Sequence, residues 1–272
     1  MDGFITLVED GIADDVARPF AGGDTYFGGV YAGFGPLISE RFDIDGYLLA
    51  LVSPRASRPM MADREWGARF TAGSRVKHRA GMIDTRLEAG VQAGRDDADR
   101  RILAYHGNLE VGAIFLDDRL RFAVEGLIAS GDDPDTTGAN EGFHHLFPTA
   151  HKWLGLADVI GFGGGRNGSG RSNLLGGVLH VEIRPAPAWT ARIDAHYFAR
   201  PEDFVLVDPL DPMLTTRLSS GPAAFELDVG GGYDIGPGLK VRTGYSLFLP
   251  DRAWYGIGDP AHFWELELRY DR

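Results

Sequence analysis

The chain has 272 residues, with 38 glycines, no cysteine and a formal net charge of −12. Without cysteine it has neither disulfides nor thiolate chemistry, and its negative charge argues against nucleic acid as a partner. Its mean hydropathy is −0.15, and no apolar run is long enough for a transmembrane helix. We expect a single domain over residues 1–272, because no linker divides the chain.

Apolar and polar residues alternate along nearly the whole sequence, which is the pattern of β-strands with two unlike faces. Counting gives about twelve segments of roughly ten residues, the length that a tilted strand needs to cross a membrane. In chain order they are residues 3–8, 25–33, 41–52, 65–72, 83–93, 103–115, 120–128, 174–184, 189–197, 225–234, 239–247 and 264–270.

The connections between these segments alternate in length. The short ones are at residues 35–36, 117–118, 185–187 and 236–238, and the long ones at 53–63, 130–172, 201–222 and 250–261. Transmembrane barrels have this arrangement, with short periplasmic turns and long outer loops.

The two faces also differ in chemistry. The apolar face carries aromatic residues near strand ends, as membrane interfaces favour: Trp66, Phe115, Trp189, Tyr197, Tyr233, Tyr245, Trp264 and Tyr270. The other face carries charges of both signs, which a packed core could not bury unpaired. The sequence therefore predicts an all-β, antiparallel transmembrane barrel of about twelve strands, complete or part of a larger barrel. The alternative is a soluble β-sandwich or solenoid with one solvated face.

The loop at residues 130–172 is too long for an ordinary hairpin connection. It is rich in large apolar residues, which need a place to be buried, so we expect it to fold across the mouth of the barrel. The residues predicted to narrow the path there are Phe143, Phe147, His151, Lys152 and Asp158.

The same loop carries a recognisable motif. SGDD at 130–133 is followed by Phe143, by LFPTAHKWLGLADVIG at 146–161 and by Asn173 at the start of a strand. This pattern resembles the alginate-export family of bacterial outer-membrane β-barrels. The chain departs from the family at Ala150, where Gly or Asn is usual, and in the glycine-rich stretch 161–170. The resemblance implies the C-terminal part of a longer member, and we expect an export signal and further strands to be missing.

Charged residues on the predicted inner face mark the expected path of a solute, because rings of charge set the selectivity of pores. They are Arg69, Arg86, Glu88, Arg121, Glu125, Glu182, Arg192, Asp194, His196, Lys240 and Arg242. In the resembled family a basic lumen passes an anionic uronic-acid polymer, and Arg binds carboxylates bidentately. Cross-strand ion pairs that only stabilise the wall are the alternative reading.

Other motifs have ordinary explanations. The glycines at 163, 165 and 168 match a dinucleotide-binding pattern but lack the strand before and helix after it. Acidic residues at 132–141 do not have the spacing of a calcium loop, and the three loop histidines lack the further ligands of a zinc site. No GxSxG elbow occurs. We predict no cofactor, no metal and no enzymatic activity.

The sequence thus predicts a porin-like channel in the bacterial outer membrane. Its partners would be the lipid bilayer and a polar solute, either small or an acidic polysaccharide such as alginate. The alternative functions are an outer-membrane hydrolase or esterase, and a soluble β-rich carbohydrate-binding protein.

Overall fold

The computed structural model describes residues 2–8, 25–34, 42–54, 66–96, 99–146, 154–162, 172–207, 215–252 and 258–270. These parts of the chain are almost entirely β-structure. The long strands are β1 (Asp2–Val8), β2 (Thr25–Gly33), β3 (Phe42–Pro54), β4 (Trp66–Ala80), β5 (Ile83–Arg95), β6 (Arg101–Phe115), β7 (Leu120–Ala129), β9 (Leu174–Ile183), β10 (Trp189–Arg200), β13 (Gly221–Gly236), β14 (Leu239–Pro250) and β15 (Ala261–Tyr270).

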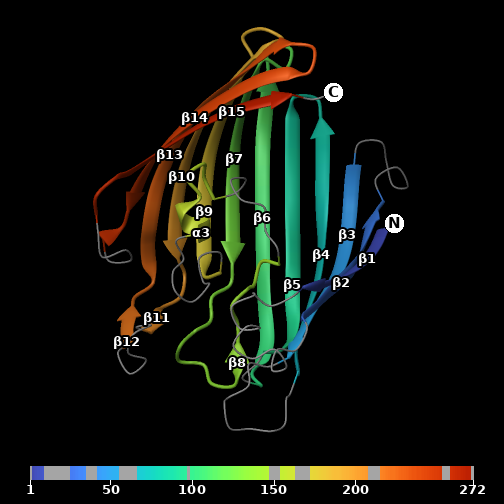
Figure 1. Cartoon of the computed structure of the whole chain (residues 1–272), viewed down its shortest axis with the longest axis vertical. Coiled ribbons are helices and arrows are strands. Elements are labelled where there is room, and N and C mark those ends of the chain that lie inside the picture. Colours follow the sequence, from blue (N-terminus) through green and yellow to red (C-terminus); the bar gives the residue numbers. More distant parts are fainter. Residues whose placement is uncertain are drawn as a thin grey trace.

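These strands pair antiparallel, each with its neighbour in the order just given. Figure 1 shows them side by side in one strongly curved sheet, with short connections at one end and long loops at the other. Among the described residues no pairing joins β1 to β15, so the path of pairings is open. The predicted all-β, antiparallel architecture of about twelve strands is confirmed.

Four short elements lie in the long loops. β8 (Ala139–Asn140) pairs parallel with β6. The helix α3 (Val159–Phe162) follows in the same loop. β11 (Phe204–Val207) and β12 (Thr215–Leu218) form a separate hairpin in the loop after β10. None of them shows a sequence pattern long enough to predict it.

The strand predicted at residues 65–72 was too short. β4 runs to Ala80, and its second half pairs in register with β3 and β5. Polar residues weaken the alternation there, but they find partners on β3. Arg75 pairs with Asp45, and Lys77 lies 3.5 Å from Asp43.

The turn at residues 117–118 forms as predicted. Asp117 and Asp118 have φ angles of 53° and 66°, and the Arg119 N–H donates to the Leu116 carbonyl at 3.2 Å. Positive φ at both central residues gives the twist that joins two antiparallel strands closely.

The two faces of the sheet differ as the alternation predicts. On β7 the side chain of Val124 is 60% exposed, whereas that of the next residue, Glu125, is 4% exposed. Leu179, paired with Val124, is exposed on the same face. On the inner face Asp194 of β10 pairs with His180 of β9 and Asp228 of β13, and all three are buried. The apolar face therefore points outward and the polar face inward.

A small apolar core lies on the inner side, where the long loop meets the wall. Phe143 and Ile160 of the loop pack with residues from six strands. Those residues are Ala104, Ala129, Leu174, Phe198, Ala223, Ala224 and Phe248. The loop is thus folded inside the curve of the sheet, and its apolar side chains hold it there.

Candidate functional site

Ser130, the first residue of the SGDD motif, fixes the start of the long loop. Its hydroxyl accepts a hydrogen bond from the Tyr105 N–H at 2.9 Å and donates to the Glu141 carbonyl at 2.6 Å. Its own carbonyl accepts from the N–H groups of Phe143 and Asn173. The motif therefore connects β6, the loop and the start of β9.

Asp132 and Asp96 both pair with Arg100, which lies in the connection between β5 and β6. Arg100 lies 2.8 Å from Asp132 and 2.9 Å from Asp96. Burial opposes ionisation of Asp96, yet hydrogen bonds from Asn140 and from the Arg100 backbone, together with the Arg100 charge, hold its pKa below the usual range. The acidic residues near 132 thus bind an arginine and loop backbone of this chain.

Gln92, which the sequence did not mark, anchors the next part of the loop. This fully buried residue on β5 accepts from the His144 N–H at 2.9 Å and donates to the His144 carbonyl at 2.7 Å. Arg69 donates to Gln92 and to the Gly142 carbonyl. An amide that pairs with both backbone groups of one residue is a specific anchor for the loop.

The last described part of the loop, residues 154–162, is held by two carboxylates of β13. The Leu156 N–H donates to Asp228 and the Ala157 N–H donates to Glu226, both at 2.9 Å. Ser246 donates to the same oxygen of Glu226 at 2.8 Å. Gly155 has a φ of 84°, and a Cβ there would lie 2.3 Å from the Glu226 carboxyl carbon. Only glycine fits at this contact.

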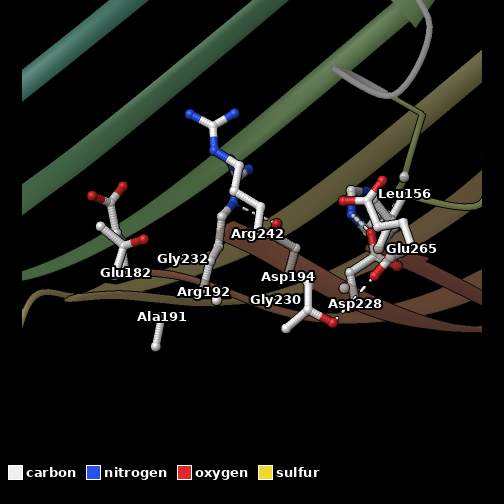
Figure 2. Close-up of a pocket in the computed structure, with 16 residues that line it drawn as sticks. Leu156, Glu182, Ala191, Arg192, Asp194, Asp228, Gly230, Gly232, Arg242 and Glu265 are labelled. Carbon is white, nitrogen blue, oxygen red and sulfur yellow. Dashed lines mark hydrogen bonds and ion pairs between the residues drawn. The ribbon is translucent and has the colours of Figure 1, made fainter. Parts of the chain in front are cut away.

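A pocket of about 480 Å³ opens beside this contact. It lies against β10, β13 and β14, and Leu156 of the loop lines one part of it. Its charged lining residues are Glu182, Arg192, Asp194, Asp228, Arg242 and Glu265. In Figure 2 Arg192 and Arg242 stand between Glu182 on one side and Asp228 and Glu265 on the other.

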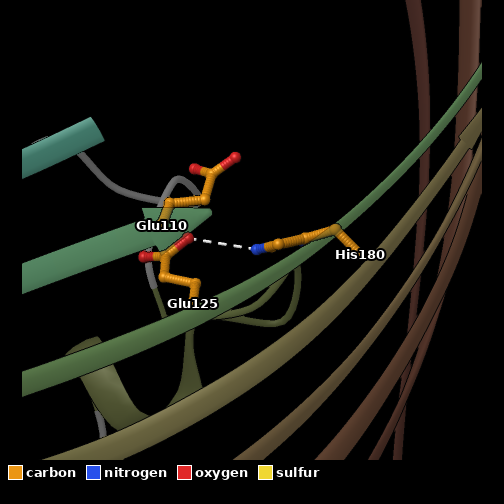
Figure 3. A group of neighbouring side chains, drawn as sticks. All are labelled: Glu110, Glu125 and His180. Atoms are coloured by element: carbon orange, nitrogen blue, oxygen red, sulfur yellow. Dashed lines mark hydrogen bonds and ion pairs between the residues drawn. The ribbon is translucent and has the colours of Figure 1, made fainter. Parts of the chain in front are cut away.

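Buried charges on the neighbouring strands pair with each other. Glu125 accepts from the Asn108 amide at 2.5 Å and lies 3.0 Å from Nε2 of His180 (Figure 3). Nδ1 of His180 lies 2.6 Å from Asp194, whose other oxygen is 2.5 Å from Arg192. Much of the wall is therefore neutralised internally, as the ion-pair reading of the sequence proposed.

A similar pairing occurs nearer the short turns. Arg121 of β7 pairs with Glu110 and lies 2.7 Å from Asp84 of β5. Further from these turns, Tyr47 of β3 lies 3.2 Å from the ring of His106 and donates to Glu88 at 3.4 Å. These groups cross from strand to strand on the inner face.

The structure places the predicted path residues on the inner face of their strands but exposes them unequally. Glu125, Asp194 and His196 are buried, whereas the side chains of Arg192 and Arg242 are 52% and 55% exposed. Further basic residues on the inner face of β4 were missed, because the strand was predicted to end before them. They are Arg75, Lys77 and Arg79.

Of the predicted narrowing residues, Phe143 and Asp158 are buried on the inner side. Phe143 lies against the His106 ring with centroids 4.5 Å apart. Phe147, His151 and Lys152 lie outside the described residues. That these residues narrow a path stays a prediction.

Comparison with known proteins identifies the family. The alginate-export family model matches residues 23–254. The chain belongs to the alginate-export family. It is a β-barrel protein of the bacterial outer membrane, and its family is one of channels. Among the residues that the structure describes, no helix is long and apolar enough to span a membrane.

Two solved structures resemble this alginate-export family chain. An outer-membrane channel from Pseudomonas putida F1 is 12% identical, with 91% of this chain and 82% of that chain covered and a TM-score of 0.41. OccK1 (OpdK) from Pseudomonas aeruginosa is 12% identical, with 98% and 68% covered and a TM-score of 0.49. A search of curated proteins found no match.

Proposed function

We propose that this outer-membrane channel lets a polar, acidic solute diffuse passively, and that an acidic polysaccharide such as alginate is its natural substrate. The support is the sorting of charge on the inner wall. Asp194, Glu226 and Asp228 are buried and accept hydrogen bonds or ion pairs from the protein itself. Arg192 and Arg242 keep about half of their side-chain surface open.

A sugar acid needs both kinds of contact that the pocket offers. The guanidinium groups of Arg192 and Arg242 bind a carboxylate through paired N–H donors. Glu182 and Glu265 line the same pocket and accept hydrogens from sugar hydroxyls. A weak preference for anions follows, because arginine extends further from the wall than the acidic side chains do.

In this proposal the long loop narrows the path that the solute takes inside the sheet. Its segment 154–162 is fixed to β13 and β14 through Glu226 and Ser246, so it occupies part of the space inside the sheet. A polymer would pass between this segment and the open wall that carries Arg192 and Arg242.

The test is the reversal potential of single channels in a salt gradient. The double variant Arg192→Ala with Arg242→Ala should lose the anion preference of the wild type. A matched control removes two positive charges elsewhere, at the exposed Arg119 in a turn and Arg217 on β12, and should leave the reversal potential unchanged. A cation-preferring wild type, or no shift in the double variant, would exclude an acidic substrate.

A further inference from the structure

His196 is a buried histidine whose ring is poorly satisfied within the part of the chain that the structure describes. It is 3% exposed, and neither ring nitrogen has a hydrogen bond of acceptable geometry. Nε2 nevertheless lies 3.1 Å from a carboxylate oxygen of Asp228. The Phe198 ring stacks against the imidazole, with centroids 5.7 Å apart. Apart from this Asp228 contact, the described residues give the ring no hydrogen bond, and a buried polar group in that state is costly, so its position calls for a ligand.

Asp194, His196 and Asp228 form a compact set of possible ligands. One donor atom from each lies within 4.8 Å of the others, and all three residues are buried. Oδ1 of Asp228 also receives no hydrogen bond from the described residues. Neither Glu226 nor Asp228 pairs with a lysine or arginine among the described residues. Buried carboxylates without a cation are strongly unfavourable.

We propose that Asp194, His196 and Asp228 bind a divalent transition-metal cation of the Zn²⁺ class. Imidazole nitrogen together with carboxylate oxygen suits Zn²⁺, whereas Ca²⁺ and Mg²⁺ take oxygen ligands. Ligands of a tetrahedral zinc ion are about 3.3 Å apart at bond lengths near 2.0 Å. The 3.1 Å between His196 and Asp228 already fits, and an oxygen of Asp194 lies within 4.8 Å of both ligand atoms, so Asp194 would have to move closer to bind the same ion.

The surroundings support the carboxylate ligands. Asp194 is oriented by His180 and Arg192, at 2.6 and 2.5 Å. Asp228 is oriented by the Leu156 N–H at 2.9 Å. Metal sites generally hold their ligands through such outer hydrogen bonds. The 480 Å³ pocket borders all three ligands, so water or a solute carboxylate has access to a fourth position.

A second cluster on the same wall shows the contrast. Glu110, Glu125 and His180 also lie within ligand distance of one another (Figure 3). The difference lies in the histidine: both ring nitrogens of His180 have partners, Glu125 and Asp194, whereas the His196 ring has no hydrogen bond from the described residues. This cluster stabilises the wall without an ion and carries no metal proposal.

Zinc binding to tag-free protein in detergent, measured by calorimetry after chelator treatment, tests the proposal. The wild type should bind one Zn²⁺, and millimolar Ca²⁺ should not displace it. His196→Gln should weaken binding at least tenfold, whereas His106→Gln, the same change elsewhere on the inner wall, should not. No zinc binding by the wild type, or equal affinity in His196→Gln, would overturn the proposal.

X-ray absorption spectroscopy of the zinc-loaded wild type gives an answer that does not depend on the folding of a variant. The expected first shell contains nitrogen and oxygen ligands with a single imidazole. A shell with two or more imidazoles would place the zinc elsewhere and overturn the assignment.

Discussion

Replacing Ile193 by Arg tests which face of the sheet meets lipid. Ile193 lies on the outward face of β10, 43% exposed, between Val181 of β9 and Val229 of β13. The next residue, Asp194, is buried on the inner face. An arginine at position 193 would therefore enter the hydrocarbon layer.

The position of Ile193 along the strand sets the size of the effect. It is four residues after Trp189, the first residue of β10, so it lies about 14 Å along the strand at about 3.4 Å per residue. At a strand tilt of about 40° this is about 10 Å along the barrel axis, near the middle of an apolar band about 25 Å tall. Arginine near the midplane costs about 2–4 kcal/mol.

The cost of the substitution can be measured as a change in the free energy of unfolding from lipid vesicles, followed by tryptophan fluorescence in denaturant. Ile193→Arg should lower it by about 2–4 kcal/mol. Thr190→Arg, on the inner face beside the pocket, should change it by less than about 0.5 kcal/mol. Arg192, one residue from Ile193, already shows that the inner face accepts arginine. Equal losses for the two variants would refute the assignment of faces.

Two further predictions concern the long loop. Gly155→Ala should raise single-channel conductance, because its Cβ would collide with Glu226 and push the loop away from the wall. Gly138→Ala is the control, because Gly138 has a similar φ of 79° but no atom within 4 Å of the added Cβ, and it should leave the conductance unchanged. Unchanged conductance in Gly155→Ala would contradict a narrowing role of the loop. Ser130→Ala should lower the unfolding free energy by about 1–3 kcal/mol, because it leaves the part-buried Tyr105 N–H and Glu141 carbonyl without the Ser130 hydroxyl. The exposed Ser74→Ala serves as control in the same denaturation assay.

The strands could be predicted because each one meets two different environments. Alternation alone placed β2 at residues 25–33, where the structure has it. The prediction stopped early on β4, where Arg75, Lys77 and Arg79 interrupt the apolar pattern. Their acidic partners are distant in sequence, so the residues around each basic side chain do not indicate the ion pair. These partners are Asp45, Asp43 and Asp118.

The loop contacts could not be predicted for a similar reason. Leu156 and Asp228 are 72 residues apart, and their hydrogen bond uses a backbone N–H that every residue except proline has. Gln92 is a single polar residue on an inner face where many are expected. The motif pointed to the right loop, but the anchoring residues on β5 and β13 follow only from the folded position of that loop.

The charge on the inner wall depends on the same contacts. Glu226 and Asp228 are buried because residues 154–162 cover them, and two loop N–H groups are hydrogen-bonded to their oxygens. Moving the loop would therefore do more than widen the path, since it would also expose two carboxylates beside Arg192 and Arg242. Gly155→Ala should then shift the reversal potential toward cations while it raises conductance. A rise in conductance with unchanged selectivity would mean that the carboxylates stay neutralised without the loop, as a cation held by Asp228 and His196 would make them.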